Sequence, residues 1–198
     1  MASSGARRSL VLVVTGPSGA GKGTLEQALL ASRPEFELAV SATTRARRPS
    51  EIDGVHYWFL TPDEFDAKIA AGEFLEYVTY VSGQRYGTLR SELGRIAGVG
   101  RIPLLDLEIE GAIRVRDTVP GAVTIFVDAP LSELERRLRE RATESAGEIG
   151  ERVELARRQK EQAGEFDHVV ENRDLDHAEE ALLGIVEREL DAAGTMPA

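Results

Sequence analysis

The sequence contains no cysteine, so disulfide bonds and thiolate-bound metals are both excluded. Long apolar runs are missing as well. The longest aliphatic run covers residues 10–14, whereas a membrane-spanning helix needs roughly 20 apolar residues. Arg7 and Arg8 precede that run, but no small-residue cleavage pattern follows it, which argues against a secretory signal. We therefore expect a cytoplasmic protein that is stabilised by an ordinary hydrophobic core.

Positive charge is scarce. The 198 residues carry 24 Lys plus Arg against 34 Asp plus Glu, for a formal net charge of -10. Such an acidic balance argues against indiscriminate binding to nucleic acid or to anionic membranes, because the long-range field repels polyanions. Only three of the basic residues are lysines, and the arginines cluster at 45–48 and 136–141. These local clusters leave room for small anionic ligands.

Apolar runs at residues 10–14, 102–107 and 122–127 predict the core strands. Continuous rather than alternating apolarity is typical of strands that are buried on both faces, as in a parallel sheet. Residues 131–141, 148–162 and 178–190 show helical patterns. The alternation of strands and helices predicts an α/β fold, with a parallel core sheet and helices on both of its faces.

Two segments interrupt this alternation. Residues 42–88 contain short strand-like pieces with aromatic side chains, a helix at 62–71 and a turn at Ser82 and Gly83, which together predict a mixed α+β insertion. Residues 139–152 are densely charged and contain Gly147 and Gly150, which indicates a mobile lid. We therefore divide the chain into core segments at 1–41, 89–138 and 153–198, an insertion at 42–88 and a lid at 139–152.

A phosphate-binding loop is the clearest motif. It lies between the first apolar run and a helical pattern at 25–31, and has the spacing G-x-x-x-x-G-K. Its residues are Gly16, Pro17, Ser18, Gly19, Ala20, Gly21, Lys22, Gly23 and Thr24. Glycines let backbone N–H groups approach a phosphate closely, and the following helix adds its positive N-terminal end. Lys22 is then expected to reach the β- and γ-phosphates of a nucleotide.

The residue after this lysine departs from the usual motif. Gly23 stands where a serine or threonine commonly helps to hold Mg²⁺, so the hydroxyl of Thr24, one position later, is the candidate metal ligand. No histidine spacing suggests a further metal site, and the sequence offers no set of nucleophile, base and orienting residue for hydrolysis.

A second cluster begins at Ser41 and carries Arg45 and Arg48, followed by tyrosines at 57 and 86. Two arginines three residues apart, together with tyrosine hydroxyls, are able to hold a phosphate monoester by charge-assisted hydrogen bonds. Taken alone, the arginine segment is typical of a solvated basic loop. Its occurrence together with a phosphate-binding loop favours a second anion site.

From about residue 10 to residue 190 the sequence resembles the guanylate kinase family. The resemblance rests on G-P-S-G-A-G-K-G-T, on S-A-T-T-R-A-R-R-P followed by D-G-x-x-Y, on G-E-F-L-E-Y and on Y-G-T. It implies that Arg45, Arg48, Tyr57 and Tyr86 hold the phosphate of GMP. It also implies that Ser41, Glu76 and Thr88 recognise guanine. The chemistry agrees, because a carboxylate accepts both the N1–H and N2–H₂ donors of guanine, whereas N1 of adenine carries no proton.

Acidic residues end the second predicted core strand, where ligands of parallel sheets bind. Asp106 is placed to orient the Mg²⁺ shell or the phosphate-holding arginines, and the resemblance gives Glu108 a part in guanine binding. The family usually has Asp and Gln where this chain has Glu108 and Glu110.

The resemblance also implies a lid that carries arginines. Arg137, Arg141 and Arg152 match arginines that stabilise the transferred phosphoryl group when the lid closes, although Ala142 replaces a usual glycine. The alternative for this segment is a solvated, charged helix. Asn172 matches a family residue near the adenine of ATP.

The implied reaction is transfer of the γ-phosphoryl group of Mg-ATP to GMP, with ATP and GMP as partners, Mg²⁺ as cofactor and catalytic roles for Lys22, Arg45, Arg137, Arg141 and Arg152. Two alternatives stay open. One is a related kinase of another small phosphate such as ribose 1,5-bisphosphate, which has no need of Ser41, Glu76 and Thr88. The other is a non-catalytic guanylate-kinase-like module that binds phosphopeptides, in which a degraded phosphate-binding loop is expected.

Overall fold

The computed structural model describes residues 10–80, 82–140 and 146–194, and its strands form two separate sheets. The larger sheet has the order β2-β7-β1-β8-β9, and every pair of neighbours is parallel. Its strands are β1 (Val11–Thr15), β2 (Phe36–Leu38), β7 (Ile102–Asp106), β8 (Ala122–Asp128) and β9 (His168–Glu171). The predicted α/β class with a parallel core sheet is confirmed.

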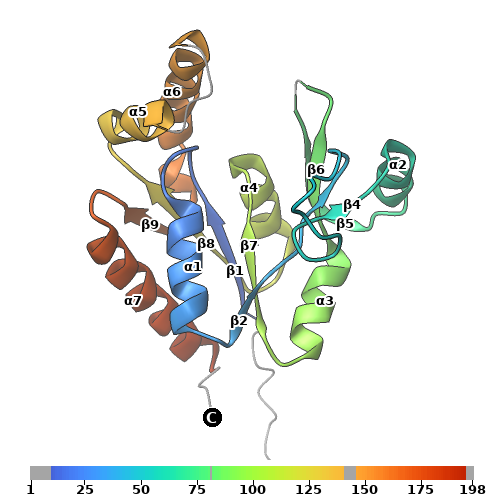
Figure 1. Ribbon diagram of the computed structural model, residues 1–198. Coiled ribbons are helices and arrows are strands. Elements are labelled where there is room, and N and C mark those ends of the chain that lie inside the picture. Colours follow the sequence, from blue (N-terminus) through green and yellow to red (C-terminus); the bar gives the residue numbers. More distant parts are fainter. Residues whose placement is uncertain (1–9, 81, 141–145, 195–198) are drawn as a thin grey trace, which may run out of the picture.

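Helices cover both faces of this sheet, as the continuous apolar strands predict (Figure 1). Leu12 and Val14 of β1 pack on one face with α1 (Lys22–Ser32) and α7 (Leu175–Ala193). Val11 and Val13 pack on the other face with α3 (Arg90–Gly98) and α4 (Ile109–Thr118). Because successive strand residues point to opposite faces, one fully buried strand serves two cores.

The smaller sheet is mixed and has the order β4-β3-β6-β5. Its strands are β3 (Ala42–Thr43), β4 (Trp58–Phe59), β5 (Phe74–Thr79) and β6 (Arg85–Leu89), and α2 (Pro62–Ala70) packs beside them. Thr61 begins α2 with a capping box to Glu64. Phe65 of α2 stacks on Phe74 of β5, with ring centroids 4.4 Å apart, and this pair anchors a small third core.

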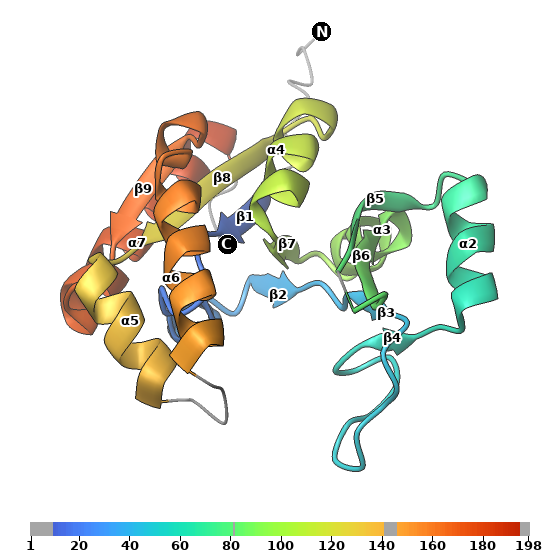
Figure 2. The same ribbon diagram turned by 90° about the horizontal axis from the view of Figure 1, so that it is seen from above.

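Two helices stand on the other side of the molecule from the smaller sheet, α5 (Leu131–Glu140) and α6 (Ala146–Lys160), followed by the short 3-10 helix η1 (Ala163–Glu165) (Figure 2). Lys160 bonds to the carboxylate of Asp128 and to the carbonyl of Ala129, which fixes the end of α6 to the end of β8. The described parts of the expected lid are helical. Arg141 and Ala142 lie outside the described residues.

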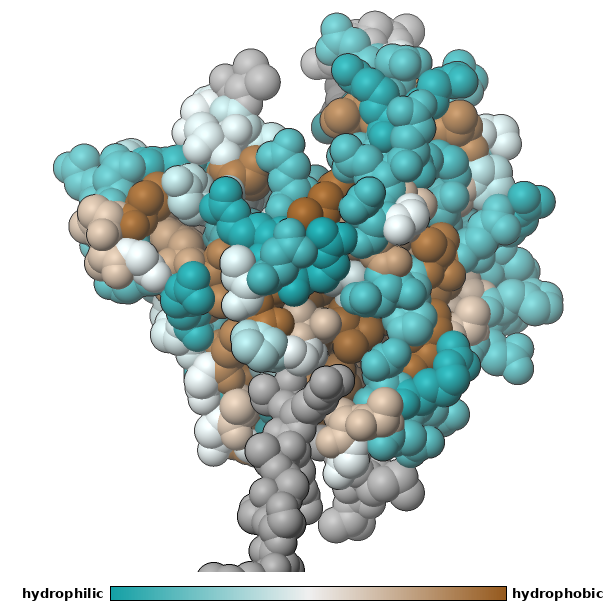
Figure 3. Space-filling model, turned by 180° about the vertical axis from the view of Figure 1, so that it is seen from behind, coloured by the Kyte–Doolittle hydropathy of each residue, from teal (hydrophilic) through white to brown (hydrophobic). Residues whose placement is uncertain are grey.

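Seen from behind, the surface is hollowed between the smaller sheet and the α5–α6 pair, and hydrophilic side chains border the hollow (Figure 3). The carboxyl ends of β1 and β7 point toward it, which is where ligands of parallel sheets bind. In the described part of the chain, no helix has both the length and the apolar character needed to cross a membrane.

Candidate functional site

The phosphate-binding loop connects β1 to α1 and encloses a cavity of about 350 Å³. Three of its glycines have positive φ: Gly16 at 140°, Gly19 at 87° and Gly21 at 93°. A Cβ on Gly16 would lie 2.2 Å from the carbonyl oxygen of Val127, so a side chain is excluded there. The cavity, called the donor cavity below, is lined by Pro17, Ser18, Gly19, Gly21, Lys22, Gly23, Thr24, Gln27 and Asp106.

Lys22 begins α1, and its Nζ donates a hydrogen bond of 2.9 Å to the carbonyl of Gly16. This bond folds the side chain back over the loop, and Lys22 lines the donor cavity together with Thr24. The N–H groups of Thr24 and Leu25 already donate to the carbonyl of Gly21. The N–H groups that precede them have no acceptor within a helix, so the loop can present them to an anion together with the Lys22 cation.

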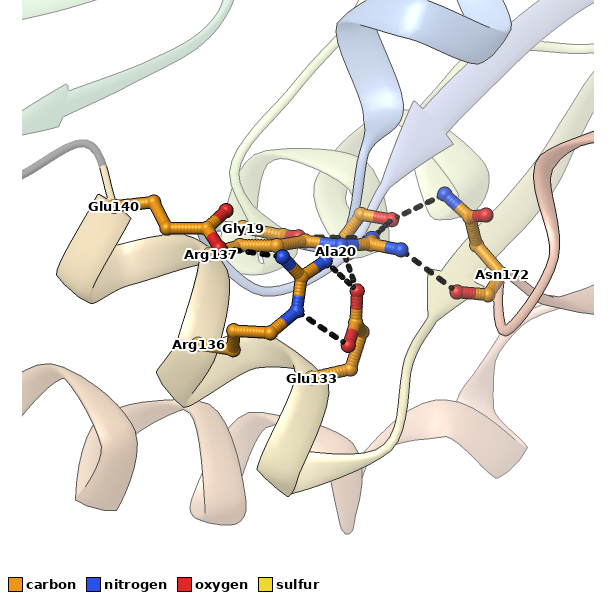
Figure 4. Close-up of polar contacts among 7 residues, drawn as sticks. All are labelled: Gly19, Ala20, Glu133, Arg136, Arg137, Glu140 and Asn172. Carbon is orange, nitrogen blue, oxygen red and sulfur yellow. Dashed lines mark hydrogen bonds and ion pairs between the residues drawn. The ribbon is translucent and has the colours of Figure 1, made fainter.

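Arg137 of α5 braces the loop from outside (Figure 4). Its guanidinium donates to the carbonyls of Gly19, Ala20 and Asn172, each at 3.3 Å, and Glu133 accepts from its Nε at 2.9 Å. Asn172 is 2% exposed, and its Nδ2 donates to the carbonyl of Ala20 at 2.8 Å. The structure therefore places both residues against the loop backbone, a bracing role that sequence reasoning missed.

A second cavity, of about 510 Å³, lies between the two sheets and is called the acceptor cavity below. Among its lining residues are six of those expected to bind an acceptor: Ser41, Tyr57, Glu76, Tyr86, Asp106 and Glu108. Lys22 and Asp106 line both cavities. Ligands in the two cavities would thus meet at the same pair of side chains.

Glu76 and Thr88 face one another across the β5–β6 pair, where they are partners in register. Glu76 is 5% exposed and Thr88 is 1% exposed. Burial raises the pKa of Glu76, and hydrogen bonds from Thr88 partly oppose that rise. A largely desolvated carboxylate held by one neighbour is suited to accept further hydrogen bonds from a ligand.

Arg45 forms a two-pronged ion pair with Glu51, with N···O distances of 2.9 and 2.8 Å. Glu51 also accepts the backbone N–H of Arg48 at 2.8 Å, and the bonds from Arg45 and then Arg48 lower the pKa of Glu51 to about 2. The Arg45 guanidinium lies 5.2 Å from the ring centroid of Tyr57. Sequence reasoning missed Glu51, although an acid three residues after Arg48 is a detectable signal.

Tyr80 of the smaller sheet's hairpin donates a hydrogen bond of 2.8 Å to Glu108, which lies just after β7 in the larger sheet. Its ring packs edge to face on Tyr86 at 5.4 Å, and Tyr86 packs on Tyr57 at 5.9 Å. A row of three tyrosines therefore connects the arginine segment to Glu108. Sequence reasoning missed Tyr80, because 28 residues separate the two bonded partners.

Two carboxyl groups lie near Lys22. Desolvation by the surrounding protein raises the pKa of Asp106, and Lys22 opposes that rise. Glu26 of α1 is 4% exposed, one of its oxygens has no partner among the described residues, and burial followed by repulsion from Asp106 raises its pKa. At both groups the Lys22 ammonium favours the charged carboxylate and so opposes part of the rise in pKa. Sequence reasoning missed Glu26, whose only visible feature is its place in the helix after the loop.

The arginines expected to contact the phosphates do not converge on one point. Arg137 contacts the loop backbone, and Arg152 lies on the exposed side of α6, outside both cavities. Arg45 and Arg48 lie beside the acceptor cavity without lining it. Any direct contact of these arginines with a shared ligand therefore requires movement of the α5–α6 pair or of the arginine segment.

Comparisons with known proteins agree on one family. The family model described as guanylate kinase matches residues 7–189. A guanylate kinase of Synechococcus elongatus is 49% identical over 173 residues, which cover 87% of this chain and 94% of that protein. A guanylate kinase of Lactococcus lactis is 40% identical over 183 residues, 92% of this chain and 89% of that protein. The crystal structure of guanylate kinase from Anaplasma phagocytophilum superimposes with a TM-score of 0.68 at 23% identity, covering 96% and 98% of the two chains.

Proposed function

Because the chain belongs to the guanylate kinase family and is a nucleotide kinase, we propose that it transfers the γ-phosphoryl group of ATP to GMP, giving ADP and GDP. The observation that supports this reaction best is the junction of the donor and acceptor cavities at Lys22 and Asp106. Phosphoryl transfer needs the attacking oxygen and the transferred phosphorus in line, so two anion cavities that meet at one cation suit it.

ATP is assigned to the donor cavity. The positive-φ glycines turn backbone N–H groups toward the β- and γ-phosphates, and Lys22 neutralises the charge that spreads over the transferred group. Arg137 and Asn172 hold the carbonyls of Gly19 and Ala20 from outside, which keeps the loop in the shape that binds phosphate.

Magnesium fits the oxygen donors of the donor cavity. Thr24 and Asp106 both line it, and no cluster of three potential metal ligands occurs among the residues that the structure describes. Mg²⁺ in kinases is held by one or two protein oxygens together with waters and substrate phosphates, so a sparse donor set is the expected one. When bound there, the metal supplies charge neutralisation for the phosphate oxygens.

GMP is assigned to the acceptor cavity. Glu76 would accept from N1–H and N2–H₂ of guanine, with Ser41, Thr88 and Glu108 around the base. AMP would leave the buried Glu76 carboxylate without donors, and a site built to bond a polar group rejects the analogue that lacks it. The GMP phosphate is assigned to Arg45, Arg48, Tyr57 and Tyr86, beside the junction with the donor cavity.

The transferred phosphoryl group gains its last partners when the lid closes. Arg141 and Arg152 are assigned to this step together with Arg137, which would exchange its bonds to the loop carbonyls for bonds to the phosphoryl group. Arginines placed there stabilise the developing charge and exclude water. The GMP phosphate is already anionic near neutral pH, so positioning and charge neutralisation carry the reaction and no general base is required.

The proposal is tested by a coupled assay of ADP release with ATP and Mg²⁺ and with GMP, AMP, CMP, UMP or ribose 1,5-bisphosphate as acceptor. We expect turnover with GMP and a strong preference for it over AMP. Turnover with ribose 1,5-bisphosphate alone, or equal use of GMP and AMP, would contradict the proposed acceptor. Binding of GMP without any release of ADP would indicate a non-catalytic module.

A further inference from the structure

We propose that Gly111 is a positioning residue for guanine recognition, because its missing side chain leaves the space in which the carboxylate of Glu76 lies. The inference rests on the proposed function, which gives Glu76 its role as acceptor for the base. Gly111 is the third residue of α4, and α4 packs against β5, the strand that carries Glu76.

The contact between the two residues is close. A Cβ built on Gly111 would lie 2.7 Å from Oε2 of Glu76 and 3.1 Å from its Cδ and Cγ. Its three nearest atoms all belong to this one side chain. Any residue larger than glycine at this position therefore competes for space with the Glu76 carboxyl group.

Backbone conformation gives no other reason for a glycine here. Gly111 has helical dihedral angles, and it is absent from the glycines with positive φ. Glycine is less favourable than alanine inside a helix, so its use at a regular helical position needs a packing reason. A Cβ placed on Gly94 in α3 would meet no described atom within 4 Å apart from its chain neighbours and the nearby backbone of its own helix, so crowding is not general among the helical glycines.

Gly87 of β6, the strand that pairs with β5, also lies close to Glu76, but a side chain there would meet different atoms. A Cβ there would lie 2.7 Å from the backbone oxygen of Glu76, 2.8 Å from Cβ of Tyr77 and 2.9 Å from the ring of Phe74. Those atoms are fixed by the sheet and the small core, so Gly87 is required by the fold. At Gly111 the crowded atoms end a side chain that is able to move, so the substitution changes where the carboxylate lies and leaves the backbone in place.

Gly111 supports Glu76 from behind. Glu76 lines the acceptor cavity and also a neighbouring cavity of about 600 Å³, whereas Gly111 lines only the neighbouring one. An added methyl group thus pushes the carboxylate without touching the base itself. The approach of 2.7 Å falls 0.7 Å short of the 3.4 Å at which ordinary contact begins. Binding sites work only when their groups are held to within about 0.5 Å, so this displacement is large enough to break paired hydrogen bonds.

Gly111→Ala should therefore separate substrate recognition from stability. We expect kcat/KM for GMP to fall by about tenfold or more, mainly through KM, because a hydrogen-bonding group is displaced from the base. The KM for ATP should be unchanged, and the melting temperature should stay the same or rise by about 2–4 °C. Gly94→Ala is the matched control and should leave both KM values unchanged.

A double-mutant cycle with Glu76→Asp tests whether the effect acts through Glu76. Aspartate is one methylene shorter, so its carboxylate retreats from the space that the new methyl group would fill. In the Glu76→Asp background we expect Gly111→Ala to change kcat/KM for GMP by less than about twofold, since coupled residues are not additive.

Three results would overturn the inference: a normal KM for GMP in Gly111→Ala, an equal rise of both KM values, or additive effects in the cycle. A fall in melting temperature together with loss of activity would instead assign Gly111 a structural role and would also count against it. Failure of the proposed function is seen separately, because it would appear as a lack of GMP turnover in the unsubstituted protein.

Discussion

The donor and acceptor cavities are built in different ways. The donor cavity is made largely by the backbone of one nine-residue loop, whose shape depends on three glycines with positive φ. The acceptor cavity is made by side chains that come from both sheets and span residues 22 to 108. The first site depends on local chain geometry, whereas the second depends on neighbours that hold each side chain, such as Glu51 for Arg45 and Tyr80 for Glu108.

This contrast predicts how the two sites respond to substitution. One side chain at the donor cavity should dominate, because the remaining donors are backbone groups that mutation does not remove. At the acceptor cavity the losses should be graded, from residues that contact the base to residues that hold them.

Lys22→Ala should have the largest effect. Removing the one lysine that faces both cavities should lower kcat by about 10²–10³-fold, because it removes a preorganised group that stabilises transition-state charge. Steady-state kinetics with both substrates varied checks this. Lys68→Ala is the control and should have no effect, since Lys68 lies in α2 and pairs with Glu73, outside both cavities. An equally small loss in both variants would contradict the role of Lys22.

Glu76→Gln should have the second-largest effect and should change the kinetics with GMP but not with ATP. Glutamine offers one acceptor where glutamate offers two, so kcat/KM for GMP should fall by about 10–100-fold, given that a hydrogen bond to a charged group is worth roughly 1.5–3 kcal/mol. The KM for ATP should be nearly unchanged. The control is Glu73→Gln, three residues earlier and exposed. Parallel losses for GMP and ATP would remove Glu76 from the base-reading role.

Glu51→Gln tests whether a residue that holds Arg45, without itself contacting the substrate, affects GMP binding. Losing the two-pronged pair should free Arg45 and raise the KM for GMP by about 3–10-fold, since the phosphate would then bind a less ordered arginine. Measurement of KM for GMP and ATP separates this from a general defect. A lower KM for GMP would show instead that Glu51 competes with the phosphate for Arg45.

The pH dependence of the Arg45–Glu51 ion pair follows from the direction in which the pKa of Glu51 is shifted. The pKa of Glu51 is lowered from 4.5 to about 2, so the folded protein keeps the charged carboxylate where an unpaired one would be protonated. The pair is complete above pH 4.5 and is lost as the pH falls toward 2. Between about pH 5.5 and 9, ionisation of Glu51 should therefore contribute no change in the KM for GMP of the unsubstituted protein.

Sequence reasoning predicted those parts of the molecule that are formed by residues close together in the chain. The buried strand β1, the glycine loop and the start of α1 are consecutive, so their pattern is visible within one short stretch of chain. The short edge strands β2 and β9 were not predicted. Each has only three or four residues, some of them exposed, and such a short stretch has no apolar pattern that distinguishes it from a loop. The helices α3 and α4 were missed too, since only a few of their residues are buried and charged residues lie among them.

For the acceptor cavity, the sequence supplied residue types but no partners. Glu76 and Thr88 became neighbours through a register that includes an irregularity between Phe74 and Glu76, and a shift of one residue would have turned Glu76 to the other face. The space beside Gly111 and the bond from Tyr80 to Glu108 join segments that are far apart in the chain. Such contacts depend on how α4 and β5 pack, which composition and periodicity do not encode.

Tyr80→Phe should have the smallest effect and defines the lower end of the graded series. Phenylalanine keeps the ring contact on Tyr86 and removes only the hydroxyl that donates to Glu108. A buried hydrogen bond to a charged group is worth roughly 1.5–3 kcal/mol, but Tyr80 is 42% exposed and solvent weakens such a bond, so we expect a rise of only about two- to fivefold in the KM for GMP. The KM for ATP should not change, and Tyr77→Phe, three residues earlier, serves as control. If Tyr80→Phe instead lowered the KM for GMP, the hydrogen bond would be a contact between the two sheets that must break before guanine binds. Tyr80 would then compete with guanine for Glu108, rather than hold Glu108 in position for the base.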